Sequence, residues 1–271
     1  MLIAQLTDLH IKQGGKQAYR KVDTLRCLQN AVQHINHLNP RPDYVVITGD
    51  LGDFGTEQEY QVIRQELKKL QIPLRVVPGN HDHRDNLRVG LQQLVDFDHS
   101  EFCNFVVEQG EQVLLGLDSS VIGKSYGFLS SQTLEWLQSQ LARLSNKSVL
   151  IFLHHPPMHV GLGHMDVQNL TNADSLYEVL SQFDNVCGLC AGHLHRPITA
   201  TWRSIPVWVG PSHSHSVTLD LDPNAPSSFS LEPRAIQLLR FENDSVVSHI
   251  SYIEDSDGPH PFFDEQGKLI D

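Results

Sequence analysis

Short apolar runs rich in β-branched residues alternate with longer segments of helical periodicity over the first two thirds of the chain. Continuous apolar runs of this length are typical of strands buried on both faces. Five runs share this pattern: Leu2–Leu6, Tyr44–Thr48, Leu74–Val77, Ser148–Leu153 and Val186–Cys190. Four segments carry apolar residues at the spacing of one helix face: Thr24–Leu38, Glu57–Leu70, Ser130–Leu144 and Asn172–Phe183. Strands that alternate with helices predict a layered α/β fold.

The helical pattern stops near residue 205. Four further runs predict strands with no helix between them: Ile205–Val209, Ser216–Leu221, Ala235–Phe241 and Ser245–Ile253. Residues 222–228 have the composition of a loop, and residues 255–271 form an irregular tail. Because no internal repeat or long linker divides the sequence, we expect a single domain over residues 1–271.

Composition and charge exclude several classes of protein. The 271 residues include 20 Lys and Arg against 32 Asp and Glu, a formal net charge of −12, which argues against a nucleic-acid polymer as partner. No apolar run reaches the roughly 18–20 residues of a membrane-spanning helix. The start of the chain lacks the basic and apolar regions of a signal peptide. Four cysteines do not suggest a disulfide framework in a chain of this length. We therefore expect a cytoplasmic protein without membrane contact.

Polar side chains follow the five strands of the first group. Loops at the carboxyl ends of strands in an α/β sheet converge on a crevice where ligands bind. Nine side chains occupy these positions: Asp8, His10, Asp50, Asn80, His81, His154, His155, His193 and His195. Imidazole nitrogens and hard oxygen donors suit metal ions such as Zn, Mn or Fe. The sequence therefore predicts a metal site built from several loops.

The order of these motifs resembles the calcineurin-like metallophosphoesterase superfamily. Asp-x-His, Gly-Asp, Gly-Asn-His-Asp, a strand ending in His-His, and Gly-His-x-His follow one another between residues 8 and 195. Within this superfamily, the chain resembles the branch of class III cyclic-nucleotide phosphodiesterases and glycerophosphodiesterases. Four segments are similar to the glycerophosphodiesterase members of that branch: Met1–Ala4, Glu59–Val62, His154–Pro157 and Asp257–Glu265. The resemblance implies a four-layer αββα sandwich of mixed β-sheets flanked by helices. The strands and tail from about 205 to 271 would complete the second sheet and offer an oligomer contact.

The resemblance also implies two divalent or trivalent metal ions, of Fe, Mn, Zn or Co. The first set of ligands would be Asp8, His10, Asp50 and His195. The second would be Asp50, Asn80, His154 and His193, with Asp50 bridging the two ions. His81 would be catalytic and would contact the substrate, which His213 would also bind. Asp53 and Asp82 are candidate acceptors for the second ring N–H of metal-bound histidines.

The implied activity is hydrolysis of small phosphodiesters, either 3′,5′-cyclic nucleotides such as cAMP or glycerophosphodiesters. In-line attack by a metal-bridging hydroxide would carry the reaction. One alternative is a phosphomonoesterase or phosphoprotein phosphatase on the same site, where Arg84 could grip the dianion. Another is a non-enzymatic scaffold. We also expect a homo-oligomer, a dimer or higher, with residues 85–110 and those after 220 at the interface. The loop Gly14–Tyr19 is a candidate lid or rim of the site.

Overall fold

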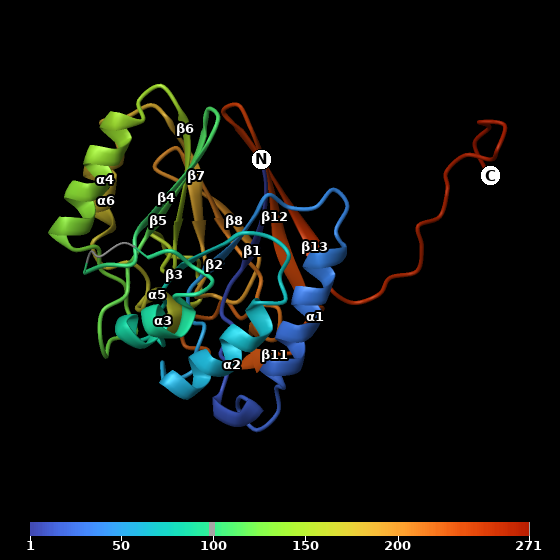
Figure 1. Cartoon of the computed structure of the whole chain (residues 1–271), viewed down its shortest axis with the longest axis horizontal. Coiled ribbons are helices and arrows are strands. Elements are labelled where there is room, and N and C mark those ends of the chain that lie inside the picture. The colour runs from blue at the N-terminus through green and yellow to red at the C-terminus, as the bar shows by residue number, and fades with distance from the viewer. Residues whose placement is uncertain (98–100, 271) are drawn as a thin grey trace.

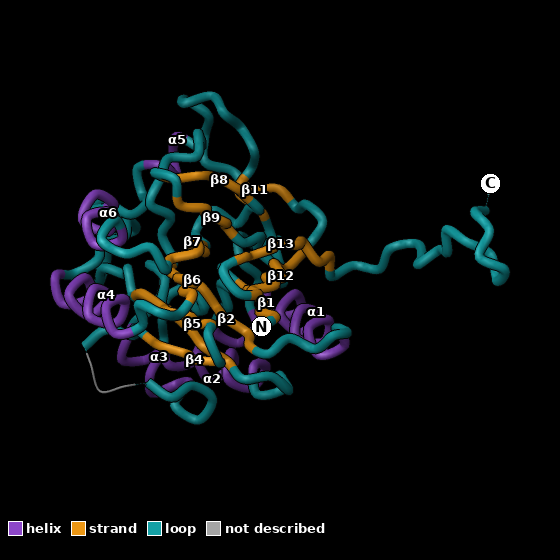
Figure 2. The backbone as a smooth tube through the Cα atoms, turned by 90° about the horizontal axis from the view of Figure 1, so that it is seen from above, coloured by secondary structure: helices purple, strands orange, loops and turns teal. Residues whose placement is uncertain are grey.

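The computed structural model describes residues 1–97 and 101–270. Two β-sheets lie face to face, and helices cover the outer face of each sheet (Figure 1 and Figure 2). The layers follow one another as helices, sheet, sheet and helices. This arrangement confirms the α/β class and the four-layer αββα sandwich that the sequence predicts.

The first sheet has five strands: β1 (Leu2–Leu6), β2 (Tyr44–Thr48), β3 (Leu74–Val77), β12 (Ala235–Glu242) and β13 (Ser245–Tyr252). Their order is β13-β12-β1-β2-β3. Three helices pack against its outer face: α1 (Thr24–His37), α2 (Glu57–Leu67) and α3 (Arg84–Leu91). Strands β1, β2 and β3 are parallel, so the loops that follow them leave the sheet at the same edge.

The second sheet has six strands: β4 (Phe105–Gln109), β5 (Gln112–Leu117), β6 (Ser148–Leu153), β7 (Val186–Ala191), β8 (Ile198–Trp202) and β9 (Ile205–Val209). Their order is β4-β5-β6-β7-β9-β8, and β5, β6 and β7 are parallel. Two helices cover its outer face: α4 (Ser131–Arg143) and α6 (Ala173–Leu180).

Smaller elements lie in the connections between these layers. They are the 3₁₀ turn η1 (Gln13–Gly15), the short helix α5 (Gly163–Asp166), and the two-stranded ladder of β10 (Ser216–Val217) with β11 (Phe229–Ser230). The predicted strand Ser216–Leu221 is therefore shortened to two residues.

Helices begin where the sequence provides capping side chains. The Asp23 carboxylate accepts a hydrogen bond from the backbone N–H of Arg26 at the start of α1. Thr56 and Glu59 form a reciprocal capping box at the start of α2. Such caps satisfy N–H groups that have no partner within the helix.

A buried apolar layer joins the two sheets. Its side chains include Ile3 and Leu239 from the first sheet and Leu150 and Phe152 from the second, all of them fully buried. Apolar burial of this kind stabilises the fold by about 25 cal/mol for each Å² removed from water. The two sheets are therefore held rigidly, and the loops at their edges keep fixed positions relative to one another.

The C-terminal strands do not all complete the second sheet, so that part of the expectation is wrong. β9 joins the second sheet, but β12 pairs antiparallel with β1 in the first, and β13 extends that sheet. The reason is that β12 is apolar on both faces. Ile236 packs against the helices, while Leu239 and Phe241 pack between the sheets, so β12 requires an interior place beside β1.

Residues 85–110, which we expect at an oligomer interface, also contribute to the core of the fold. They contribute α3, whose Leu87 and Leu91 are fully buried, and the edge strand β4, which pairs with β5. Residues 98–100 of this segment lie outside the described residues.

The chain after β13 runs away from the body of the protein in both views (Figure 1 and Figure 2). Phe262 and Phe263 in this tail are 80% and 57% exposed. Hydrogen bonds within the tail form a small hairpin in which Phe263 pairs with Leu269. Within the described residues, no helix combines the length and the hydropathy needed to cross a bilayer.

Candidate metal centre

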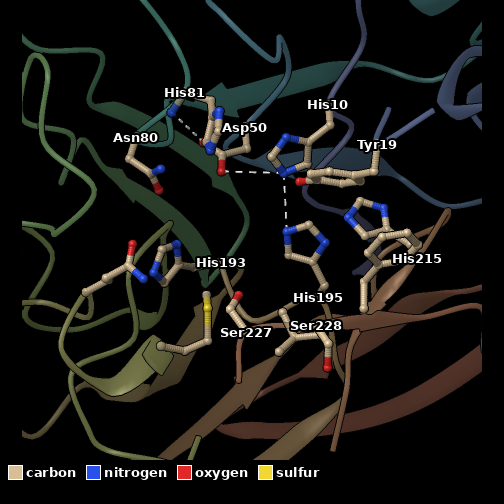
Figure 3. A pocket seen from close by; sticks show the side chains of 14 residues that line it. His10, Tyr19, Asp50, Asn80, His81, His193, His195, His215, Ser227 and Ser228 are labelled. Carbon is tan, nitrogen blue, oxygen red and sulfur yellow. Dashed lines mark hydrogen bonds and ion pairs between the residues drawn. The ribbon is translucent and has the colours of Figure 1, made fainter. Parts of the chain in front are cut away.

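The loops after β1, β2, β3, β6 and β7 meet at one edge of the two sheets. Figure 3 shows side chains from the loops after β1, β2, β3 and β7 around a common cavity. All seven side chains that the sequence proposes as metal ligands are brought together here. Six of them are buried: Asp8, His10, Asp50, His154, His193 and His195. Asn80 is half-buried.

The backbone at this site adopts a conformation that L-residues avoid. Asp8, His10, Asp50, His193 and His195 have φ angles between 46° and 71°, in the left-handed region. Each such residue costs about 1–3 kcal/mol, and strain of this kind concentrates at functional sites. Five of the seven candidate ligands have this strained backbone, which indicates that they belong to a functional site.

Backbone hydrogen bonds hold the first two loops against each other. The N–H of Asp8 donates to the carbonyl oxygen of Gly49 at 3.1 Å, and the N–H of His10 donates to that of Asp50 at 2.9 Å. The side chains of Asp8 and Asp50 are therefore fixed close together, although like charges repel each other.

The Asp50 carboxylate lies between two imidazoles that belong to different sheets. Its Oδ2 is 3.7 Å from Nε2 of His10 and 3.4 Å from Nε2 of His154. Its Oδ1 accepts a hydrogen bond of 2.8 Å from the backbone N–H of His81. Burial alone would raise the pKa of Asp50, but His154, His81 and His10 hold it well below its usual value.

His154 presents an unprotonated nitrogen to two oxygen acceptors when its ring is neutral. Its Nδ1 donates to the carbonyl oxygen of Thr48 at 2.6 Å, so the lone pair of Nε2 faces Asn80 Oδ1 at 3.2 Å and Asp50 Oδ2. Three electron-rich atoms that face one another require a cation among them or a second proton on the ring. Burial opposes that proton, but Asp50 raises the pKa of His154 to about 9.

A second group of donors surrounds Asp8. Nδ1 of His10 lies 3.1 Å from Asp53 Oδ1, which directs Nε2 of His10 toward Nε2 of His195 at 3.2 Å. Nε2 of His195 is in turn 3.4 Å from Asp8 Oδ1. Burial, opposed in part by His154, raises the pKa of Asp8 to about 6.

His193 completes the cluster from the opposite side. Its Nε2 is buried and has no hydrogen-bond partner among the described residues. Burial and the neighbouring His154 lower the pKa of His193 well below its usual value, so the ring is neutral, as metal binding requires. An unpartnered buried nitrogen is costly, and metal coordination would remove that cost. The donor set of imidazole nitrogens and hard oxygens fits ions of the Fe, Mn, Zn and Co kind.

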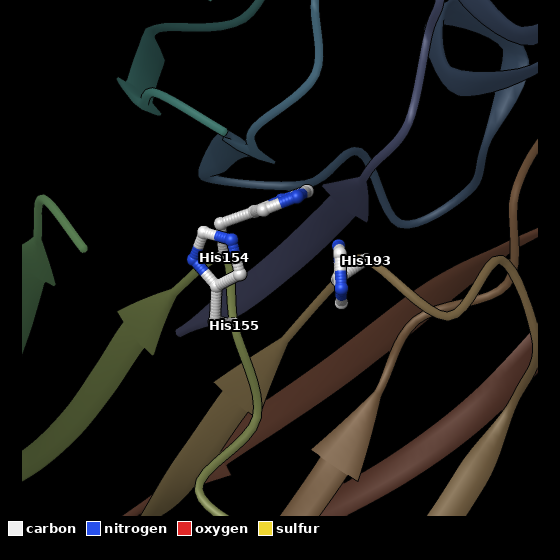
Figure 4. Close-up of side chains that lie close together, drawn as sticks. All are labelled: His154, His155 and His193. Atoms are coloured by element: carbon white, nitrogen blue, oxygen red, sulfur yellow. The ribbon is translucent and has the colours of Figure 1, made fainter. Parts of the chain in front are cut away.

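His155 is also buried within this cluster, beside His154 and His193 (Figure 4). Its ring centroid is 4.8 Å from that of His193, and its Nδ1 is 2.8 Å from the hydroxyl oxygen of Ser119. It does not line the cavity, so it contacts the candidate ligands on their side away from the cavity.

Asp53 and Asp82 differ in what they contact. Asp53 bonds to the His10 ring as expected, and Lys12 Nζ is 2.5 Å from its other oxygen. Burial would raise the pKa of Asp53, but the bonds from His10 and Lys12 lower it to about 2. Among the described residues, Asp82 makes no hydrogen bond to a histidine ring, contrary to expectation. It instead accepts hydrogen bonds from the Tyr60 hydroxyl and from three backbone N–H groups: those of Leu51, Gly52 and Gly79. Asp82 therefore fixes the loops that carry Asp50 and Asn80.

The cavity has a volume of about 420 Å³, within the range of roughly 300–1,000 Å³ that is typical of ligand sites. His81 lies at its opening, where Nδ1 bonds to the carbonyl oxygen of Asp53 at 2.8 Å. Tyr19, from the loop proposed as a rim, also lines the cavity. Burial and nearby acids raise the pKa of Tyr19 to about 12, so its phenol is neutral at physiological pH.

His213 does not face the cavity, although it was expected to bind substrate. It is fully buried, and His215 lines the cavity instead. The His-Ser-His sequence gave no basis for choosing between them, because residues two apart face the same side of an extended segment. The irregular backbone of this segment separates the two rings.

Arg84 is not free to grip a substrate dianion. Its Nε is 2.6 Å from Oδ2 of Asp118, and its Nη2 donates to the carbonyl oxygen of Ser120. Asp118 is fully buried, so this ion pair would be costly to break. Neither Arg84 nor any other Lys or Arg of the described residues lines the cavity.

Two packed β-sheets with a cluster of His and Asp side chains at one edge define the class of protein, which is a phosphoesterase. The family model described as calcineurin-like phosphoesterase matches residues 1–197, and the chain belongs to this metal-dependent family.

Several known proteins are similar to the chain. It is 43% identical over 273 residues, covering 100% of both sequences, to the probable glycerophosphodiester phosphodiesterase GpdQ of Arcobacter nitrofigilis. It is 32% identical over 238 residues to the 3′,5′-cyclic adenosine monophosphate phosphodiesterase CpdA of Escherichia coli K12, covering 86% and 85% of the two chains. A dimetal phosphatase from Danio rerio shares the fold, with a TM-score of 0.70, 17% identity and coverage of 94% and 97%.

The role of Asp82 can be tested through Tyr60. Tyr60→Phe removes the hydroxyl that donates to Asp82 at 2.8 Å and accepts from the backbone N–H of His83. Because both partners lose a hydrogen bond at a largely desolvated site, we expect the free energy of unfolding to fall by about 1–3 kcal/mol. Urea unfolding measures this change. Tyr252→Phe, at a ring that is 59% exposed, is the matched control, and an equal effect of both substitutions would contradict the assignment.

Proposed function

We propose that this protein hydrolyses small phosphodiesters with the help of two metal ions held at the cluster. The observation that carries the proposal is the position of Asp50, whose carboxylate lies within 3.7 Å of donors from both groups. A carboxylate in that place can bridge two cations. When bound, such a pair lowers the pKa of a coordinated water toward neutrality and neutralises charge that develops on the phosphoryl oxygens.

The ligands divide between the two ions as follows. Asp8, His10, Asp50 and His195 would hold the first, because the Nε2 atoms of both histidines converge beside the Asp8 carboxylate. Asp50, Asn80, His154 and His193 would hold the second. Nε2 of His154 already faces Asn80 and Asp50, and the unpartnered Nε2 of His193 is available to the same ion.

His81 would donate a proton to the leaving oxygen. The bond from its Nδ1 to the Asp53 carbonyl oxygen fixes the ring and leaves Nε2 for the substrate, where it has a proton to donate when the ring is in the imidazolium form. Its ring also packs edge-on against His10, with a centroid separation of 4.7 Å, so it lies beside the proposed metals. A proton donor matters most for a poor leaving group such as an alkoxide.

The charge of the cavity favours diesters over monoesters. A phosphodiester is a monoanion, whereas a monoester approaches a dianion near neutral pH. Of the described residues, no Lys or Arg lines the cavity, and Arg84 is paired with Asp118. The names of the relatives contain two classes of monoanionic phosphodiester, glycerophosphodiesters and 3′,5′-cyclic nucleotides, and we propose these as the substrates.

Initial rates on the Mn-loaded protein test this proposal. We expect bis(4-nitrophenyl) phosphate to be hydrolysed faster than 4-nitrophenyl phosphate. His81→Ala should lower the rate on 3′,5′-cAMP by about 10²–10⁴-fold, and less on the nitrophenyl diester, because nitrophenolate needs no proton to leave. His159→Ala, at an exposed histidine outside the cavity, is the matched control. A preference for the monoester, or no hydrolysis with metal bound, would contradict the proposal.

We further propose that the exposed tail makes the contact of a homo-oligomer. Phe262 and Phe263 present apolar rings to solvent. The hairpin fixes the backbone of this segment, so the two residues do not need to be ordered when a contact forms. Large exposed apolar side chains that lie together mark surfaces where proteins associate.

Sedimentation velocity tests the tail. Replacing Phe262 and Phe263 by Ser should lower the sedimentation coefficient to that of a smaller species, because the contact loses its apolar area. Val167→Ser, at a residue that is 75% exposed on the body, is the control and should leave the coefficient unchanged. An unchanged coefficient for the double variant would exclude the tail from the interface.

A further inference from the structure

We propose that an aromatic wall of the cavity, formed by Tyr19, His215 and Phe229, selects phosphodiesters that carry a planar aromatic group. The inference rests on the proposed function and assigns to Phe229 the discrimination between nucleoside-type and small aliphatic substrates. Tyr19 and His215 lie on one side of the cavity, opposite Asn80 (Figure 3).

The three rings form one compact cluster. The ring centroids of Tyr19 and Phe229 are 5.1 Å apart with an interplanar angle of 32°, so the two rings overlap at a shallow angle. His215 meets both nearly edge-on, at 5.3 Å from Tyr19 and 5.7 Å from Phe229. Contacts of this kind are favourable between aromatic rings. The cluster therefore presents a stable, largely apolar surface rather than three independent side chains.

The wall is continuous with the proposed metal centre. The His215 ring centroid is 4.5 Å from that of His195 and 5.8 Å from that of His10. An organic group esterified to the phosphorus would therefore lie against the wall.

Two features of the backbone hold the wall in place. Tyr19 has a φ angle of 50°, an unusual backbone conformation for a bulky residue, at a position where its ring lines the cavity. Phe229 pairs with Val217 in the β10–β11 ladder. Nη1 of Arg196, the residue after His195, donates to the carbonyl oxygen of Val217 at 2.8 Å and is 2.6 Å from Glu232. The ladder that carries Phe229 is thus tied directly to the proposed metal loop.

The chemistry around the wall suits a neutral, flat group with polar edges. Met165 and Val217 add apolar contacts, while Gln168, Ser227 and Ser228 offer hydrogen-bonding groups. A nucleobase has such a flat face and polar rim, and stacking on an aromatic ring stabilises it. A glycerol or ethanolamine group offers no flat face to the wall.

Substitution of Phe229 tests this inference on the full-length, Mn-loaded protein. We would measure kcat and KM for 3′,5′-cAMP and for glycerophosphoethanolamine, with products separated by liquid chromatography. For Phe229→Ala, the loss of kcat/KM on cAMP should exceed the loss on glycerophosphoethanolamine by about 5- to 150-fold, the equivalent of one lost base stack. The loss should fall mainly on KM, because the wall binds the substrate and its transition state alike. Phe229→Tyr keeps the ring and should retain most of the preference.

Leu231→Ala is the matched control, since Leu231 follows β11, is 56% exposed and does not line the cavity. It should leave the ratio of the two kcat/KM values at the wild-type level. Equal losses on both substrates in Phe229→Ala, or a ratio that does not change, would overturn the aromatic wall while leaving the phosphodiesterase proposal intact. Failure of the wild-type protein to hydrolyse either diester would instead contradict the proposed function.

Discussion

The Asp50 carboxylate is held almost out of contact with water between imidazoles supplied by two different sheets, and the organisation of the site depends on it. A buried carboxylate is costly unless cations or donors surround it. Here His10 comes from the loop after β1, while His154 comes from the loop after β6 in the second sheet. The apolar layer around Phe152 keeps those loops in register, so the core between the sheets positions the chemistry at their edge. The backbone strain at Asp8, His10 and Asp50 is sustained by the same rigid frame.

Much of this site is predictable because its residues stand in fixed places relative to strands. Each candidate ligand follows a buried apolar run, and parallel strands bring their carboxyl ends together without further information. The outer part of the cavity is different. Tyr19, His215 and Phe229 come from irregular segments, whose positions depend on tertiary contacts such as the bonds from Arg196 to Val217 and Glu232. Neither local sequence patterns nor the family resemblance specify those contacts. The resemblance therefore assigned the substrate contact to His213, whereas His215 lines the cavity.

The same distinction applies to the fold. β1, β2, β3, β6 and β7 were predictable from continuous apolar runs, and α1, α2, α4 and α6 from helical periodicity, whereas the shorter α3 and α5 were not predicted. The sheet to which each C-terminal strand belongs was not predictable, because an apolar strand can pair with any free sheet edge. β12 lies beside β1 since both of its faces can be buried there. Arg84 likewise offered a free cation by sequence alone, and only the folded chain places the fully buried Asp118 against it.

The proposed centre depends on two metal ions bridged by Asp50, and the number of bound ions tests it most directly. Equilibrium dialysis of the metal-free protein against Mn²⁺, with metal counted by mass spectrometry, would give the number of ions per chain. We expect two ions for the wild-type chain and fewer than one for Asp50→Ala, because both ligand groups lose their shared carboxylate. A wild-type chain that saturates at one ion, or an Asp50→Ala chain that still binds two, would contradict the bridging role of Asp50.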